Sequence, residues 1–322
     1  MSSVRNKGRR MHLEVIHLDE ALIPQKAFLA ACSERGAAIV EAREEGRKVR
    51  LWSSEADMER FSSKLPKRNG PTLSFLGSGD FHHVSALLIG RAACNAAEPF
   101  TVIHLDNHPD WVRRSRGTHC GSWINRALAI PQVQKIITAG VCSKDLQHPE
   151  WKSANLTALK TGRLELFAYE QPPSAVRGNY GSGASYHQEG GRIQWNCISD
   201  MGIASFTKLL LSRASTPTVY ITFDKDVLVR EEAVTNWDQG KLRLDEVIGF
   251  IRAIAQEHAI IGADVIGDYS PVRYSGGPWS FIKKWGETLI DHRRTRLAPE
   301  EIAARNEAVN LRLLNVFADA MG

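Results

Sequence analysis

Three side chains that can bind metal occupy alternate positions in the stretch HLDNHPDW, which runs from His104 to Trp111. Asp106, His108 and Asp110 follow the apolar run TVIHL, at the point where a buried strand would end. Residues two apart in an extended segment point to the same side, so these three side chains can converge on one site. A histidine in the middle position has no turn-forming role, which makes the D-x-H-x-D run more specific than an aspartate-rich turn.

Two further apolar runs end in residues of the same chemical kind. FLGSGDFHHVS finishes with Asp80, His82 and His83, and YITFDKDVL supplies Asp224 and Asp226. Taken singly, each aspartate could be a turn residue or a helix N-cap. In an open α/β sheet, however, ligands bind beyond the carboxyl ends of the strands. Three such clusters in one chain therefore predict a common site.

A divalent metal is the chemistry that these residue types favour. Aspartates buried together repel one another and are costly to desolvate unless cations neutralise them. Four carboxylates and two imidazoles suit two ions better than one. Oxygen-rich ligation with some imidazole and no thiolate favours Mn²⁺, with Fe²⁺, Co²⁺ and Zn²⁺ as weaker candidates.

The order of G-D-F-H-H, D-x-H-x-D and D-x-D resembles the ureohydrolases, a family that includes arginase, agmatinase and formiminoglutamase, over about residues 72–275. The resemblance implies a three-layer α/β/α fold with a mostly parallel central sheet. It also implies two Mn²⁺ ions bridged by a hydroxide. The implied metal ligands are His82, Asp106, His108, Asp110, Asp224 and Asp226, with Asp106 and Asp224 bridging both ions and His83 as an alternative to His82.

Two further residues acquire roles through the same resemblance. THCGSW is similar to the family's His-Gly element, which implies that His119 shuttles a proton to the leaving amine. DVIGDYSP is similar to the segment whose acidic residue pairs with the substrate guanidinium, which implies that role for Asp268. Without the family, His119 would be a loop histidine and Asp268 a cap or turn residue.

The implied function is hydrolysis of a C–N bond in a linear amidine or guanidino compound, by an enzyme that is not a true arginase. The loop from Asp110 to His119 is shorter than the arginase loop, and it carries Arg113, Arg114 and Arg116 in place of an Asn and Ser pattern. Such a loop could receive the carboxylate of a guanidino or formimino acid, or it could be a solvated surface cluster.

Two alternatives remain open at this stage. Deacetylase-like zinc amidohydrolases share the implied fold, and the tandem His82-His83 is similar to their paired histidines. They bind one zinc and usually lack the last carboxylate of D-x-H-x-D, so Asp110 argues against them. The other alternative is a non-catalytic regulatory protein that keeps its metal for structure.

Strand and helix patterns alternate along the chain and predict βαβ units. Strands are expected at 14–18, 48–52, 71–76, 101–105, 135–141, 163–169, 218–223 and 259–267. Helices are expected at about 22–45, 83–98, 121–130, 202–213, 243–257 and 298–320. We expect one domain over 1–322, with a disordered or loosely held N-terminus (about 1–10) and a loop insertion at about 171–196, which is rich in Gly, Pro and Ser.

Composition narrows the class of protein. Apolar residues make up 43% and charged residues 24% of the 322 residues, which is ordinary for a globular protein. The five cysteines are an odd, scattered set, and no apolar segment follows the basic N-terminus, so a cytoplasmic protein is expected. The net charge of +5 is dispersed and no long apolar run occurs, so neither nucleic acid nor membrane is an expected partner. A homo-oligomer remains open.

Overall fold

Eight strands form one parallel sheet in the order β2-β1-β4-β14-β13-β5-β7-β8. The computed structural model describes residues 11–114, 116–273, 284, 288, 292–293 and 295–322. The strands are β1 (His12–His17), β2 (Ala38–Glu41), β4 (Thr72–Gly77), β5 (Phe100–Leu105), β7 (Val133–Val141), β8 (Leu164–Ala168), β13 (Thr218–Asp224) and β14 (Ala259–Ile266).

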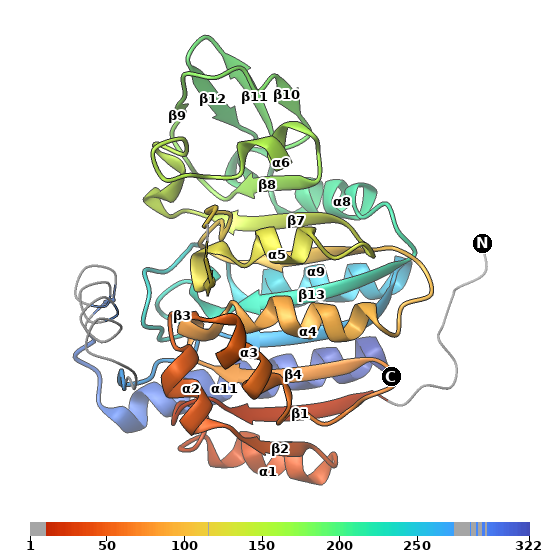
Figure 1. The fold of residues 1–322 in the computed structure, drawn as a ribbon, viewed down its shortest axis with the longest axis vertical. Coiled ribbons are helices and arrows are strands. Elements are labelled where there is room, and N and C mark those ends of the chain that lie inside the picture. Colours follow the sequence, from red (N-terminus) through yellow and green to blue (C-terminus); the bar gives the residue numbers. More distant parts are fainter. Residues whose placement is uncertain (1–10, 115, 274–283, 285–287, 289–291, 294) are drawn as a thin grey trace.

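Helices cover both faces of this sheet, which confirms the predicted three-layer α/β/α fold (Figure 1). In Figure 1, α4 (Val84–Ala93) and α5 (Ile124–Leu128) lie in front of the sheet, and α9 (Leu244–Glu257) and α11 (Pro299–Met321) lie behind it. The remaining helices are α1 (Lys26–Glu34), α2 (Arg43–Val49), α3 (Glu55–Ser62), α6 (Leu156–Lys160), α7 (Ile198–Met201) and α8 (Ile203–Arg213).

Each face of the sheet packs a separate apolar core. Ile103 and Leu105 of β5 join the core beneath α9 and α11, whereas Val102 joins the core beneath α4 and α5. The alternation follows from the two-residue period of a strand, and burial on both faces explains why these strands are almost continuously apolar.

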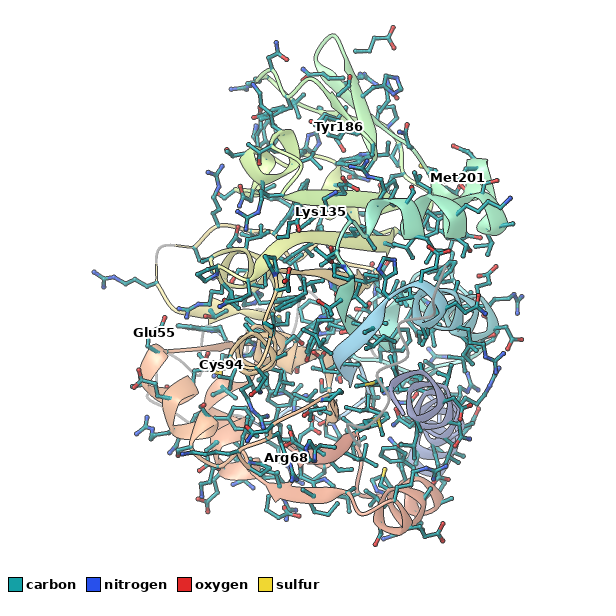
Figure 2. The ribbon with its side chains drawn as sticks, turned by 90° about the vertical axis from the view of Figure 1, so that its right-hand side faces the viewer. Glu55, Arg68, Cys94, Lys135, Tyr186 and Met201 are labelled. Carbon is teal, nitrogen blue, oxygen red and sulfur yellow. The ribbon has the colours of Figure 1, made fainter. Side chains whose placement is uncertain are left out.

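The segment 171–196, which we predicted to be a loop, forms most of a small antiparallel sheet in the order β10-β11-β12-β9. Its strands are β9 (Ser174–Ala175), β10 (Ser182–Gly183), β11 (Tyr186–Glu189) and β12 (Arg192–Trp195). A Gly-Gly turn joins β11 to β12, and the rings of Tyr186 and Trp195 lie 6.2 Å apart between centroids. Tyr186 marks this sheet above Lys135 of β7 in Figure 2. The loop prediction was therefore wrong, because the Gly and Ser content concealed a hairpin with its own apolar face.

Two predictions near the N-terminus were also wrong. The expected helix 22–45 is α1, then strand β2, then the start of α2, and the expected strand 48–52 comprises the last two residues of α2, a bend at 50–51 and Trp52, the first residue of a two-residue strand. Gly36, with φ 73°, follows α1 and turns the chain toward β2, which completes the sheet at its edge. In α2, Gly46 is required because a Cβ there would lie 1.8 Å from the carbonyl oxygen of Leu18.

The other predicted strands and helices are confirmed, with ends that shift by a few residues; α4 and α5 are shorter than 83–98 and 121–130. The N-terminal residues 1–10, expected to be disordered, lie outside the described residues. Among the described residues, no helix combines the length and the apolar character needed to cross a bilayer. A short antiparallel pair, β3 (Trp52–Ser53) with β6 (Thr118–His119), lies beside the main sheet and leads into the site.

Candidate metal centre

The predicted ligands come together because β5 and β13 are neighbours in the sheet. Leu105 at the end of β5 is in register with Phe223 near the end of β13, so the residues that follow them lie side by side. The arrowheads of β1 and β13 point to the left in Figure 1, where these strands end. His82 reaches the same place from the turn η1 (Gly79–Phe81), which follows β4.

A first group of donor atoms surrounds one oxygen of Asp106. His82 Nδ1 lies 3.0 Å from Asp106 Oδ2 and 3.2 Å from Asp110 Oδ2, and His104 Nε2 lies 2.8 Å from Asp106 Oδ2. All four side chains are buried, and one ligand atom from each lies within 4.8 Å of the others. This group is a candidate metal site.

A second group shares Asp106 with the first. His108 Nδ1 lies 2.9 Å from Asp226 Oδ2 and 3.6 Å from Asp106 Oδ1, and the three residues form a second candidate cluster. Asp224 Oδ2 lies 3.5 Å from His82 Nδ1, while Asp224 Oδ1 accepts the backbone N–H of Asp226 at 2.9 Å. The structure thus brings all six sequence-predicted ligands together and adds His104.

The carboxylates of this centre are electrostatically coupled. Burial, reinforced by the charge of Asp106, raises the pKa of Asp224 to about 7 and raises the pKa of Asp226 well above its usual range. Burial alone would also raise the pKa of Asp106, but the neighbouring His104 holds it well below its ordinary value. Carboxylates that cannot all ionise together form the donor set that a divalent cation would satisfy.

Asp110 is held in an unusual backbone conformation at this centre. Its φ is 46°, in the left-handed region that few residues other than glycine adopt. Trp123 Nε1 donates to Asp110 Oδ2 at 2.6 Å, and both side chains are buried. The strained backbone and the indole together turn this carboxylate back toward His82, and such strain is often found at functional sites.

Of the two tandem histidines, His82 is the one that faces the carboxylates. Behind it, His82 Nε2 lies 3.0 Å from the hydroxyl of Thr222, which donates to Asp264 at 2.8 Å. Tyr220 donates to the other oxygen of Asp264, also at 2.8 Å. Contacts of this kind fix the orientation of a metal-binding imidazole.

His83 lies apart from this network. Within the described part of the chain, neither ring nitrogen of His83 has a hydrogen-bond partner. Burial lowers the pKa of His83 to about 3, so the ring stays neutral. The structure therefore provides no carboxylate partner for the alternative ligand.

A cavity of about 340 Å³ opens above the centre. Its floor includes His82, Asp106 and Asp224, and its wall includes His119 and Trp237. The cavity is of the size that small ligands occupy.

His119 is buried at 7% exposure, and its Nδ1 accepts the backbone N–H of Gly121 at 2.9 Å. This contact leaves Nε2 as the nitrogen that carries the proton in the neutral ring. Trp123 lies behind Asp110, and Trp111 is fully buried against Trp195.

Asp268 is the predicted site residue that the structure does not bring to the cavity. Lys225 Nζ lies 2.5 Å from Asp268 Oδ2, and Gln25 Nε2 donates to Asp268 Oδ1 at 2.7 Å. Asp268 is buried and is not part of the cavity wall. The role expected for it, pairing with a substrate guanidinium, stays a prediction, and in this structure the carboxylate pairs with Lys225 inside the protein.

The three arginines of the loop after Asp110 also separate in space. Only Arg114 lines the cavity. Arg113 is exposed and donates from Nη2 to the carbonyl of Ala154 at 3.3 Å, and Arg116 is exposed outside the cavity wall. The interpretation of these arginines as a solvated surface cluster therefore fits Arg113 and Arg116, but not Arg114.

The sequence did carry a signal for His104, which we missed. His104 stands two residues before Asp106, so positions 104, 106, 108 and 110 continue one alternation. His104 also lies within the apolar run TVIHL, a pattern that indicates a strand residue and not a ligand. Asp238, whose Oδ1 lies 3.1 Å from His108 Nε2, lies in a segment without strand or motif signals, and only the structure places it at the site.

Comparisons with known proteins agree with this architecture. No family model matches the chain. An uncharacterized protein of Thermotoga maritima is 25% identical over 210 residues, which are 65% of this chain and 62% of that protein. The match therefore spans less than two thirds of that relative.

Solved structures extend the likeness to nearly the whole chain. The arginase of Bacillus caldovelox superposes with a TM-score of 0.59 at 12% identity, covering 98% of this chain and 99% of that one. Proclavaminate amidino hydrolase from Streptomyces clavuligerus gives a TM-score of 0.57 at 14% identity, covering 97% and 93%. The resemblance read from the motifs is thus confirmed at the level of the fold: the chain has the arginase-like α/β fold of the ureohydrolases.

Proposed function

We propose that this protein is a metal-dependent hydrolase that cleaves a C–N bond in a small guanidino or formimino compound. The observation that carries the proposal is the sharing of Asp106 between two buried donor groups at the strand ends. His82, His104, Asp110 and Asp106 would hold one divalent cation, and His108, Asp226 and Asp106 a second, with Asp224 between them. Mn²⁺ is the metal that this oxygen-rich set favours, ahead of Fe²⁺, Co²⁺ or Zn²⁺.

Two divalent cations held close together would supply a water of lowered pKa as a nucleophile near neutral pH. His119 lines the cavity beside the same carboxylates, and its Nδ1 is already engaged by Gly121. Its Nε2 would therefore face the cavity, and His119 protonated to imidazolium would give its Nε2 proton to the departing nitrogen, since a neutral amine leaves far more easily than an amide anion. Trp237 forms part of the cavity wall.

A single-zinc amidohydrolase remains the second candidate function, and one observation favours it. The first donor group alone contains two imidazoles and two carboxylates, enough ligands for one tetrahedral ion. Metal stoichiometry separates the two functions, because the proposed one requires two ions per chain.

The test begins with metal content. The purified protein, stripped and then loaded with Mn²⁺, is expected to retain two ions per chain by elemental analysis, and the Asp226→Asn variant to retain one. Asp200→Asn, at an exposed position on α7, is the matched control and should retain both. One ion per chain in the unaltered protein would favour the single-zinc amidohydrolase. A protein that binds no metal ion would rule out both candidate functions.

The second part of the test measures products separately. Guanidino compounds should release urea and formimino compounds should release formamide, with both reactions lost in His119→Asn while metal content is kept. Absence of either product across acidic and basic members of both classes would overturn the proposed hydrolase and leave a metal-binding protein.

A further inference from the structure

The charge of the side chains that line the cavity is negative at its floor and positive at its rim. At the floor, the carboxylates of the metal centre are almost fully buried. At the rim, Arg114, Lys144, Lys152 and Arg293 line the same cavity and are exposed to solvent. A small molecule that fills the cavity would therefore meet oxygen ligands at one end and cations at the other.

Two of the rim cations have carboxylate neighbours. Lys152 Nζ lies 2.5 Å from Asp145 Oδ1. Arg293 lies near Asp238, whose Oδ1 lies 3.1 Å from His108 Nε2. Because Asp145 and Asp238 are matched in this way, neither is available to a cationic ligand.

Arg114 and Lys144 are left with their charges unmatched. Among the described residues, neither side chain makes an ion pair or a hydrogen bond. They come from different segments, Arg114 from the loop after Asp110 and Lys144 from the turn η3 (Lys144–Leu146) that follows β7. A guanidinium and an ammonium that converge on one opening favour a carboxylate and disfavour a second cation.

We infer that the substrate carries an anionic group, most simply a carboxylate, at the end remote from the scissile C–N bond, and that Arg114 and Lys144 select it. This inference rests on the proposed function and names its substrate class: guanidino or formimino acids in preference to amines such as agmatine.

The experiment compares two guanidines with the same four-methylene chain, 5-guanidinopentanoate and agmatine, which differ in ending with a carboxylate or an ammonium. With the manganese-loaded protein, kcat/KM for urea release is expected to be about tenfold or more higher for the acid, the size of effect that a few partly exposed charges produce. Added salt should narrow this ratio, because exposed charges are screened.

Variants assign the effect to particular side chains. Arg114→Gln and Lys144→Gln should each raise KM for the acid about threefold, leave kcat unchanged and leave KM for agmatine unchanged or lower. Arg113→Gln is the matched control, because it removes the same charge from a neighbouring arginine outside the cavity. An equal effect of Arg113→Gln would show that only net charge matters and would overturn the inference.

Binding measured without turnover separates this inference from the proposed function. Titration of the protein with each compound should show tighter binding of the acid, dependent on Arg114. Equal or tighter binding of agmatine, with urea still released, would overturn the anionic substrate and leave the hydrolase standing. Tight binding of the acid without release of urea or formamide from any compound would overturn the hydrolase, and the substrate assignment with it.

Discussion

Lys225 Nζ lies 2.5 Å from Asp268 Oδ2 in an ion pair whose two side chains are 0% and 1% exposed. Lys225 stands between Asp224 and Asp226, yet its side chain is directed to the carboxylate that follows β14 rather than to the metal centre. β13 ends at Asp224, and the 3-10 turn η4 (Lys225–Val227) that follows directs the lysine away from the two aspartates. The pair therefore ties the ends of β13 and β14 together behind the proposed ligands.

Removing the lysine charge should destabilise the protein strongly. Lys225→Met leaves Asp268 ionised and buried without its cation, which is expected to lower the free energy of unfolding by about 3–5 kcal/mol. Lys225→Met combined with Asp268→Leu should recover much of this loss, because no buried charge remains. Denaturant unfolding measures the free energy of unfolding of both variants. Lys241→Met, which breaks the exposed pair with Glu170, is the control and should cost less than about 1 kcal/mol. A similarly small cost for Lys225→Met would contradict the prediction.

Asp19 should make stability depend on pH. Burial raises its pKa to about 6, and the cation of Arg50, whose Nη1 lies 3.6 Å from Asp19 Oδ2, offsets only part of this effect. The folded protein thus binds a proton more tightly than the unfolded chain does. The stability contributed by that proton is fully present below about pH 4, the ordinary Asp range, and is lost as the pH rises through 6.

The variant Asp19→Asn removes this titration. Relative to the unaltered protein, its free energy of unfolding should rise between pH 4 and pH 6 and then level off, by on the order of 3 kcal/mol in total. The difference between the two proteins at each pH cancels the titration of all other groups. A flat difference across this range would show that the carboxyl of Asp19 titrates normally.

The sequence predicted which candidate ligands gather at the strand ends better than it predicted the surrounding structure, for a physical reason. The D-x-H-x-D spacing places Asp106, His108 and Asp110 directly after β5, and the parallel order of β5 and β13 brings Asp224 and Asp226 beside them. Convergence of this kind depends on local geometry and on a sheet edge common to all strands. Both can be inferred from spacing and from the apolar runs.

The features that were missed depend on partners distant in sequence. Whether Asp268 serves a substrate or a lysine depends on Lys225, which lies 43 residues away. The small sheet of β9 to β12 is stabilised by burial of Tyr186 and Trp195, which outweighs a composition typical of loops. β2 is a short edge strand that its own sequence does not distinguish from helix, and pairing with β1 decides its conformation. Tertiary context overrides local propensity in each case.

Gly267 should be intolerant of any side chain. Its φ is 98°, and a Cβ there would lie 2.2 Å from Asp224 Oδ1 and 2.5 Å from the backbone nitrogen of Lys225. Gly267→Ala must therefore displace the end of β13, and we expect both a lower melting temperature and the loss of at least one bound Mn²⁺ per chain. Gly249→Ala in α9, where a Cβ would meet nothing within 4 Å, is the control and should keep both ions. Full metal content in Gly267→Ala would show that Asp224 is not needed to hold it.

Thr222 should control metal affinity without contacting the metal. Its hydroxyl donates to Asp264, so its oxygen accepts the proton of His82 Nε2 and leaves His82 Nδ1 unprotonated toward Asp106 and Asp110. Replacing it by valine keeps the shape of the side chain but removes this acceptor, and losses of such supporting contacts typically cost 10- to 100-fold in metal affinity. Competition with a chelator should show a loss of about that size for Thr222→Val at one of the two sites. Thr222→Ser restores the hydroxyl and should recover most of the affinity. Equal metal affinity of the Thr222→Val and Thr222→Ser variants would contradict the prediction. It would show that His82 is oriented only by its packing against His104 and Trp123, whose ring centroids each lie 5.0 Å from that of His82.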